Sequence, residues 1–247
     1  MSLLLIDIGN STIHWAIQAP GQTLSAMQSN SYLNENIDAI LTAHWSALKP
    51  ISRVMIASVA SEAVNLCVQH WLQQQWQITP QFVHAEARGH GVHNAYIEPQ
   101  QLGSDRWMAM VAAYQLSQKA CCVLDCGTAV TFDVIEIDGQ HLGGWISPGY
   151  RLFRQSLSQE TASIGDVDEM LMDVSELGRD TKQCVNFAWH QGVVGLIQRS
   201  LLAVTSQDMD FYITGGDAKR LRPLLGDEWC YADDLVLQGL AIMASQQ

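Results

Sequence analysis

The first candidates for chemistry are an acidic side chain and a run of small polar residues at the first bend of the chain. In LLLIDIGNSTIHWAI (residues 3–17), Asp7 ends one apolar run and GNST (residues 9–12) precedes another. Such a bend can aim backbone N–H groups and hydroxyls at one point, an arrangement that binds phosphate. Asp7 would repel a bare phosphate, which favours Mg²⁺ or its water shell between the two. For one such bend alone, a hairpin with a merely polar turn is the better explanation.

A second copy of this pattern lies half a chain away. The segment CVLDCGTAVTFDVI (residues 122–135) again has an apolar run, Asp125, a glycine, a hydroxyl residue and a second apolar run. Near the end of the chain, a strand-like run at residues 211–214 leads directly into Gly215 and Gly216. A repeat of this length indicates two similar αβ lobes, each opening with a β-hairpin. Because the chain lacks the P-loop and G-x-G-x-x-G patterns, we expect two hairpins to grip the phosphate across a cleft.

The composition limits the class of protein and its partners. The chain has 247 residues, is 48% hydrophobic and carries a formal net charge of −12. Such a charge repels a phosphate backbone, so we expect no nucleic-acid partner. We also expect no membrane partner, since no uncharged apolar stretch reaches the roughly 18 residues of a spanning helix. The beginning of the chain does not resemble a signal peptide, and the six cysteines show no disulfide-framework spacing. These features favour a cytoplasmic protein.

Apolar periodicity predicts the elements that position the bends. We expect three strands and three helices, at residues 3–6, 13–17 and 54–59 and at residues 62–76, 105–117 and 234–245, respectively. Gly103 and Ser104 supply the start signal of the second helix. The segment GGWISPGY (residues 143–150) is expected to be a glycine-rich turn whose backbone passes close to another segment. The repeat divides the chain into an N-terminal lobe, residues 1–117, and a C-terminal lobe, residues 118–247.

Six short motifs, in this order and spacing, resemble one enzyme family. They are DIGNST at Asp7, YIEPQQLGSDR at Tyr96, DCGTAVT at Asp125, GGWISPG at Gly143, GRDT at Gly178 and TGGDA at Thr214. Together they resemble the type III pantothenate kinases of the actin-like ATPase and sugar kinase superfamily. The resemblance implies an α/β fold of two similar ribonuclease-H-like lobes with the nucleotide in the cleft between them. Two departures are mild: Ser11 stands where the family usually has threonine, and Cys126 where alanine is common.

The resemblance also implies a reaction, with ATP and Mg²⁺ as cofactors. The family transfers the γ-phosphoryl group of ATP to the primary hydroxyl of pantothenate, giving 4'-phosphopantothenate in the first step of coenzyme A biosynthesis. Asp105 matches the general base, although its position also suits a helix N-terminal charge or an ion pair with Arg106. Asp7 would hold Mg²⁺ through phosphate or water. The residues that match the ATP-binding positions are Asp7, Ile8, Gly9, Asn10, Ser11, Thr12, Ile13, His14 and Thr128.

The acceptor and cation sites follow from the same resemblance. The residues that match the pantothenate-binding positions are Tyr96, Gly103, Ser104, Asp105, Arg106 and Thr181. Arg106 suits the carboxylate of pantothenate because guanidinium forms bidentate bonds with carboxylates. Asp125 matches the residue that holds a monovalent cation, K⁺ or NH₄⁺, although its chemistry also suits Mg²⁺. The family implies a homodimer.

Two other functions stay open on the residues alone. One is a kinase of another small alcohol, or a phosphohydrolase, built on the same fold. The carboxylate-binding chemistry of Arg106 argues against it. The other is a non-catalytic ligand sensor or transcription accessory protein. That class is expected to lose Asp7, Asp105 or Asp125, and all three are present.

Overall fold

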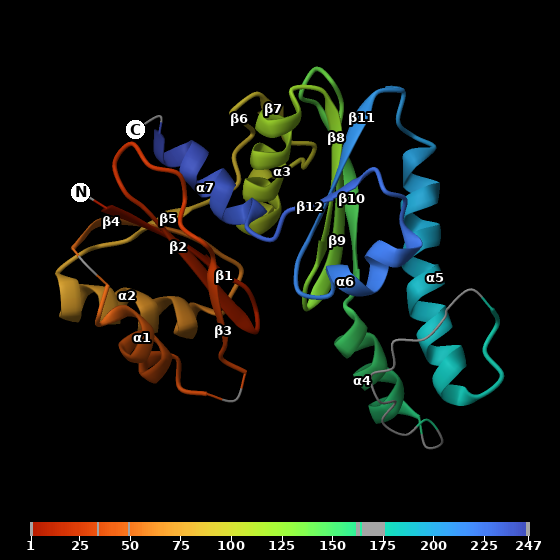
Figure 1. Cartoon of the computed structure of the whole chain (residues 1–247), viewed down its shortest axis with the longest axis horizontal. Coiled ribbons are helices and arrows are strands. Elements are labelled where there is room, and N and C mark those ends of the chain that lie inside the picture. The colour runs from red at the N-terminus through yellow and green to blue at the C-terminus, as the bar shows by residue number, and fades with distance from the viewer. Residues whose placement is uncertain (1, 34, 49, 162–163, 165–175, 246–247) are drawn as a thin grey trace. The chain divides into compact units, whose positions relative to one another are not determined.

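The computed structural model describes residues 2–33, 35–48, 50–161, 164 and 176–245. The chain forms two compact units, one comprising Met1–Leu116 with Asp234–Gln247 and the other Ser117–Asp233 (Figure 1). Within the described residues, no helix is both long enough and apolar enough to cross a membrane.

The first unit is built on a five-stranded sheet. Its elements are β1 (Ser2–Ile8), β2 (Thr12–Gln18), β3 (Gln28–Ser31), α1 (Ile37–Trp45), β4 (Ile51–Ser58), α2 (Glu62–Trp76), β5 (Gln81–Val83), β6 (Arg88–Gly89), β7 (Val92–His93), the 3₁₀ helix η1 (Pro99–Gln101), α3 (Ser104–Ser117) and α7 (Leu235–Ser245). The strand order is β3-β2-β1-β4-β5, with β2 antiparallel to its neighbours and β1, β4 and β5 parallel. The carboxyl ends of β1 and β4 therefore lie at one edge of this sheet.

The core of the first unit explains its continuous apolar strands. Leu4, Leu5 and Ile6 of β1 are fully buried, as expected for a strand that is covered on both faces. Trp45 of α1 and Trp71 of α2 pack edge to face, with ring centroids 5.6 Å apart, over one face. The helix α7 packs against β1, β2 and β4. These contacts hold β1, and the bend that follows it, in a rigid layer.

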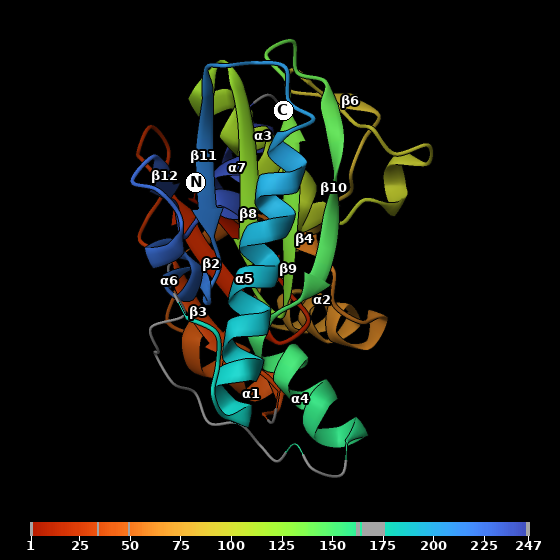
Figure 2. The same ribbon diagram turned by 90° about the vertical axis from the view of Figure 1, so that its right-hand side faces the viewer.

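The second unit repeats this plan. Its elements are β8 (Ala120–Cys126), β9 (Ala129–Ile135), β10 (His141–Pro148), α4 (Tyr150–Glu160), α5 (Thr181–Leu201), β11 (Met209–Thr214), α6 (Ala218–Leu221), the 3₁₀ helix η2 (Arg222–Leu224) and β12 (Trp229–Tyr231). The strand order is β10-β9-β8-β11-β12, with β9 antiparallel and β8, β11 and β12 parallel. Figure 2 shows α5 lying along this sheet, where Trp189, Val193 and Ile197 join the core.

The strand order in the sheet is the same in both units, and in both the second strand is antiparallel to its neighbours. This is the ribonuclease-H-like topology, so the prediction of two similar αβ lobes from the repeated bends is confirmed. The predicted strands and helices at residues 3–6, 13–17, 54–59, 62–76, 105–117 and 234–245 all occur, with bounds shifted by a few residues.

Two expectations differ from the structure. Residues 143–148 are not a turn, because they pair with Ala129–Val134 as the antiparallel strand β10. The segment 234–247 does not belong with the C-terminal lobe, because α7 packs on the sheet of the first unit and Gly239 approaches the backbone of Met108 in α3. The predicted boundary after residue 117 falls one residue beyond the end of the first unit at Leu116.

Candidate active site

The first predicted phosphate loop is the turn between β1 and β2. Ile8 pairs with Ile13 across the hairpin, so four residues, 9–12, form the turn. The Gly9 N–H donates to the Thr12 carbonyl at 3.0 Å and closes it. Asp7, at the end of β1, is half-buried, and Asn10 is exposed. The loop therefore presents a carboxylate and small polar groups at the carboxyl edge of the sheet, as the sequence predicts.

Two residues of the predicted ATP-binding group have side chains that cannot contact a ligand. Ile8 and Ile13 are fully buried, so only their backbone atoms can face a nucleotide. His14 pairs across the hairpin with Asp7. Burial lowers the pKa of His14, which keeps its imidazole neutral at pH 7.

The start of α3 is fastened to the strand beside β1. The Ser104 hydroxyl accepts from the Ser58 N–H at 2.9 Å and donates to the Ser58 carbonyl at 3.1 Å. Ser58 pairs with Ile8, and the Val59 N–H donates to the Ile8 carbonyl at 3.0 Å. These bonds place Asp105, in the first turn of α3, on the same edge of the first unit as Asp7. The hydroxyl of Ser104 is engaged with this backbone.

Gly103 is required by the position of Asp105. A Cβ at Gly103 would lie 2.5 Å from Oδ1 of Asp105, so a larger residue would displace the carboxylate. The same Oδ1 accepts from the Arg106 N–H at 2.7 Å. The glycine thus fixes where the candidate base sits.

Tyr96 and Arg106 meet, as predicted for two residues of one acceptor site. The Arg106 guanidinium donates through Nη1 to the Tyr96 hydroxyl at 2.9 Å. Its Cζ lies 5.8 Å from the centre of the tyrosine ring. Arg106 is only 6% exposed, so its cation is held in a fixed orientation beside Asp105.

The second predicted phosphate loop is the turn between β8 and β9. Cys126 pairs with Val130, so the turn has three residues, 127–129, and the Gly127 N–H donates to the Ala129 carbonyl at 2.9 Å. The Gly149 N–H donates to the Thr128 carbonyl at 3.0 Å. A Cβ at Gly149 would lie 2.3 Å from the Gly127 carbonyl oxygen, so only glycine fits there.

The segment that follows β11 closes on the same loop. The Asp217 N–H donates to the Cys126 carbonyl at 2.9 Å. Gly215 has φ +90°, and a Cβ there would lie 2.5 Å from that carbonyl oxygen and 2.6 Å from Oδ1 of Asp125. Burial raises the pKa of Cys126 well above its ordinary value, so this thiol stays protonated. Asp125, Thr128 and Gly215 therefore gather at one edge of the second sheet.

Thr181 stands apart from this group in the chain and in its exposure. It is the exposed first residue of α5, where the Asp180 carboxylate caps the helix by accepting from the Gln183 N–H at 2.8 Å. Its predicted contact with pantothenate stays a prediction.

The donor set fits a magnesium ion that is shared with phosphate groups. Mg²⁺ is usually held by one or two carboxylates and completes its shell with phosphate oxygens and water. In the described part of the chain, no group of three or more His, Cys, Asp or Glu side chains could hold a metal. Asp7 offers a single carboxylate, with Oδ1 shielded from solvent, beside the loop. This arrangement suits an ion that arrives with a nucleotide.

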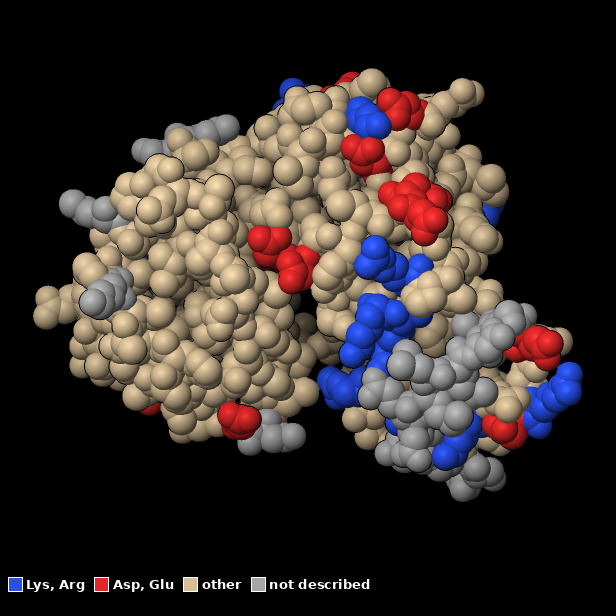
Figure 3. All heavy atoms as spheres, in the orientation of Figure 1, with Lys and Arg blue, Asp and Glu red and all other residues tan. Residues whose placement is uncertain are grey.

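Local positive charge is present on the second unit despite the net charge of the chain. Lys219 and Arg220 lie in the last turn of α6, and Arg222 begins η2. Figure 3 shows basic side chains gathered over this part of the unit. Arg220 pairs with Asp217 at 2.9 Å and lies over the ring of Tyr150, 4.3 Å from its centre. The field beside the second loop is therefore more positive than the overall charge suggests.

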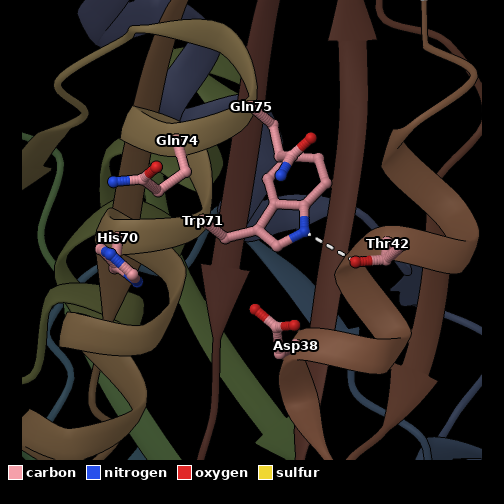
Figure 4. Close-up of a pocket in the computed structure, with 6 residues that line it drawn as sticks. All are labelled: Asp38, Thr42, His70, Trp71, Gln74 and Gln75. Atoms are coloured by element: carbon pink, nitrogen blue, oxygen red, sulfur yellow. Dashed lines mark hydrogen bonds between the residues drawn. The ribbon is translucent and has the colours of Figure 1, made fainter.

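A hollow of about 360 Å³ lies away from the predicted residues. It is lined by Asp38 and Thr42 of α1 and by His70, Trp71, Gln74 and Gln75 of α2 (Figure 4). The Trp71 indole N–H donates to the Thr42 hydroxyl at 2.9 Å. None of these residues belongs to the predicted site.

Sequence reasoning did not identify two residues that support the first loop. The Tyr32 hydroxyl donates to the Gly9 carbonyl, and the Ser31 hydroxyl donates to the Ser11 carbonyl at 3.2 Å. Ser31 ends the polar segment QSNS (residues 28–31), which has no apolar alternation, and Tyr32 follows it. No local signal marks this segment, because its strand forms only by pairing with β2.

Comparison with known proteins gives the family. The profile of the family described as type III pantothenate kinase matches residues 3–202. The type III pantothenate kinase of Nitrosococcus oceani is 39% identical over 250 residues, covering 98% of this chain and 93% of that protein. That of Halorhodospira halophila is 33% identical over 244 residues, covering 96% of this chain and 95% of that protein.

Solved structures support the fold. A Campylobacter jejuni protein described as a candidate Baf family transcriptional activator superposes with a TM-score of 0.65 at 22% identity, covering 98% of both chains. The activator of the 2-hydroxyisocaproyl-CoA dehydratase from Clostridium difficile, solved with bound ADPNP, gives a TM-score of 0.55 at 11% identity, covering all of this chain and 95% of that one. The fold is that of the actin-like ATPases and sugar kinases. By its sequence over nearly its whole length, this chain belongs to the type III pantothenate kinases, a family of phosphotransferases.

Proposed function

We propose that this protein transfers the γ-phosphoryl group of ATP to the primary hydroxyl of pantothenate, with Asp105 as general base. The product is 4'-phosphopantothenate, in the first step of coenzyme A biosynthesis. Membership of the family supports the reaction, and the residues described above support the roles.

The assignment of Asp105 as the base is supported mainly by the hydrogen bonds that attach the start of α3 to β4. Ser104 bonds both backbone groups of Ser58, and Ser58 pairs with Ile8 beside Asp7. A carboxylate that takes a proton from the acceptor must lie close to the phosphate that the acceptor attacks. In the first unit, Asp105 and the loop after Asp7 lie at the same edge of the sheet, which supports this role.

The chemical step makes one bond and breaks another. The acceptor oxygen bonds to the γ-phosphorus, the bond between that phosphorus and the β-γ bridging oxygen breaks, and ADP leaves. Asp105 takes the hydroxyl proton as the attack proceeds, which suits a carboxylate when the transferred group is loosely bound. A bound Mg²⁺ would neutralise charge on the phosphate oxygens, with Asp7 as its protein contact.

The two loops have different roles in this proposal. Residues 7–14 hold the phosphate chain from the first unit, and Thr128 adds a hydroxyl from the second. Asp125 holds K⁺ or NH₄⁺ beside the nucleotide. The turns share an Asp-x-Gly order and a closing bond from the glycine N–H, which supports a common role as anion sites.

Recognition of the acceptor is assigned to the pair of Arg106 and Tyr96. A buried guanidinium held by the tyrosine hydroxyl is pre-oriented for a carboxylate. Gly103, Ser104 and Thr181 complete the proposed pantothenate site. Panthenol, which has a hydroxyl in place of the carboxylate, should therefore be phosphorylated with a KM at least about 10-fold higher than that of pantothenate. Equal KM values for the two compounds would contradict the role of Arg106.

Asp105→Asn is the direct test of the base. We expect kcat to fall by about 100-fold or more, while nucleotide affinity changes little. The matched control is Asp38→Asn, because Asp38 is also an acidic residue in the first turn of a helix. If Asp105 acts only through the helix dipole, both variants should lose similar small amounts of stability and keep their turnover. Near-normal turnover of Asp105→Asn would exclude the base.

The cation and the assembly are tested separately. ADP release with pantothenate, measured with K⁺ and with Na⁺ alone, should be faster with K⁺, and Asp125→Asn should remove that difference. We propose a homodimer from family membership, so sedimentation should give twice the 27.3 kDa of one chain. We also propose a cytoplasmic location, which supplies ATP and suits six free cysteines.

A further inference from the structure

Three of the four carbonyl groups of the first loop accept hydrogen bonds from donors of their own unit. Thr12 accepts from the Gly9 N–H at 3.0 Å. Ser11 accepts from the Tyr32 N–H at 3.0 Å and from the Ser31 hydroxyl at 3.2 Å. Gly9 accepts from the Tyr32 hydroxyl. Two of these three carbonyls are thus held by the last residue of β3 and the residue after it.

The direction of these carbonyls decides whether the loop can bind an anion. A carbonyl oxygen carries partial negative charge, so one that faces a phosphate opposes binding, whereas an N–H favours it. Peptide units in a four-residue turn can flip, because few bonds hold them. A donor on a carbonyl disfavours the flipped state of its peptide unit before any ligand arrives.

We propose that Tyr32 and Ser31 are positioning residues for the nucleotide phosphates, acting by holding the Gly9 and Ser11 carbonyls away from the anion. This inference rests on the proposed function, since it takes the loop after Asp7 as the phosphate site. Neither residue touches the phosphate in this role. The ligand class is the phosphate chain of a nucleoside triphosphate.

The Tyr32 hydroxyl is suited to a permanent donor role. Its ring is half-buried at the end of β3, next to the loop. Burial, and then the nearby Asp7 carboxylate, raises the pKa of Tyr32 above its ordinary value. The phenol therefore keeps its proton at neutral pH and can only be replaced by another donor of similar reach.

The second unit has a corresponding backbone bond at the same position. Gly149 follows β10 as Tyr32 follows β3, because β10 and β3 are the third strands of their sheets. Its N–H donates to the Thr128 carbonyl at 3.0 Å, as the Tyr32 N–H does to Ser11. In both units, the residue after the third strand holds the carbonyl of the phosphate loop.

The test is the pair of variants Tyr32→Phe and Ser31→Ala. Tyr32→Phe removes one hydroxyl and leaves the ring and the backbone bond to Ser11. We expect KM for ATP to rise about 3- to 10-fold and KM for pantothenate to stay within about 2-fold. For Ser31→Ala, we expect a rise in KM for ATP of about 2- to 4-fold.

A matched control keeps the interpretation specific. Ser52 on β4 donates its hydroxyl to the Ser2 carbonyl at 3.2 Å, a bond of the same type at the other end of β1. Ser52→Ala should leave both KM values unchanged. A merely structural effect of Tyr32→Phe would lower the melting temperature or the active fraction without separating the two KM values, and that result would overturn the inference.

Binding without turnover separates this inference from the proposed function. Calorimetric titration with a non-hydrolysable ATP analogue should give a weaker Kd for Tyr32→Phe than for the wild type and for Ser52→Ala. If the wild type binds the analogue but releases no ADP with pantothenate, the proposed function fails and the titration still decides the inference. Equal Kd values for wild type and Tyr32→Phe would reject the role of Tyr32.

Discussion

The two hairpin turns show how one chain plan can be stabilised in two different ways. Each turn follows an Asp-x-Gly sequence, and in each the glycine N–H closes the turn on a carbonyl of the same hairpin. The first turn has four residues and the second has three, since Ile8 pairs with Ile13 and Cys126 with Val130. The repeat therefore preserves the path of the strands while the turn length varies.

The larger difference lies in how the residue after the third strand of each sheet holds the turn. In the first unit, the residue after the third strand is Tyr32, whose side chain reaches the Gly9 carbonyl. In the second, it is Gly149, whose backbone lies so close to Gly127 that no side chain fits. The first turn depends on removable hydroxyl groups, whereas the second depends on close backbone packing. The two turns should therefore fail under different kinds of substitution.

Gly149→Ala should have the largest effect on the second turn. Its Cβ would lie 2.3 Å and 2.5 Å from the carbonyl oxygens of Gly127 and Thr128, so the backbone must move. We expect a loss of about 1–3 kcal/mol in the free energy of unfolding and a large fall in kcat. Urea denaturation and an ADP-release assay measure the two effects.

The control for this substitution lies in α5 of the same unit. A Cβ at Gly192 would meet no atom within 4 Å, and alanine is the better helix former there. Gly192→Ala should leave turnover unchanged and stabilise by up to about 1 kcal/mol. If Gly149→Ala behaves like Gly192→Ala, backbone packing does not hold the second turn.

A smaller effect is expected from Gly215→Ala, and its neighbour supplies the comparison. Gly215 has φ +90°, and its Cβ would approach Cys126 and Asp125, whereas a Cβ at Gly216 would meet nothing within 4 Å. Gly215→Ala should weaken ATP binding and the response to K⁺ together, because it displaces the Asp125 carboxylate. Gly216→Ala should change both by less than about 2-fold. Gly216 lacks both the positive φ and the Asp125 contact, so equal effects of the two substitutions would show that neither feature of Gly215 matters.

Much of the fold could be predicted because its signals are local. The apolar runs at β1 and β8 and the periodicity of α2 and α3 are visible within short windows of sequence. The strand β10 was missed because GGWISPGY has three glycines and a proline, which are typical of turns. The pairing with β9, including a register shift between His141 and Gly143, outweighs those local preferences.

The candidate site divides in the same way. The residues that would touch ligands lie in compact motifs, so Asp7, Asp105 and Asp125 could be selected from sequence. The residues that hold those motifs in place do not form motifs. Tyr32 follows a polar edge strand, and its contact with Gly9 spans 23 positions in the chain. Only the folded sheet brings them together, so no short segment of the sequence contains both partners.

The smallest expected effect is on the pH dependence of stability, and it involves α4, the helix that Gly149 caps. His190 of α5 lies against Tyr150, the first residue of α4, with ring centres 5.8 Å apart. It is 6% exposed, and its Nδ1–H donates to the Asn186 carbonyl at 2.7 Å. Burial lowers the pKa of His190, although its bond to Asn186 partly opposes this. The unfolded chain therefore binds a proton more readily than the folded one just below pH 6.5, and stability should decrease as the pH falls through that range.

His190→Asn tests this, because the asparagine amide can still donate to the Asn186 carbonyl and cannot titrate near neutral pH. The loss of stability between pH 7.5 and pH 5.5 in urea denaturation should be smaller than in the wild type. Some loss should remain, since burial also lowers the pKa of His14. His70→Asn, at an exposed position of α2, is the matched histidine substitution for comparison. If His190→Asn leaves the pH dependence of stability unchanged, titration of His190 does not affect the stability of the second unit. The two turns then differ only in how their carbonyls are held.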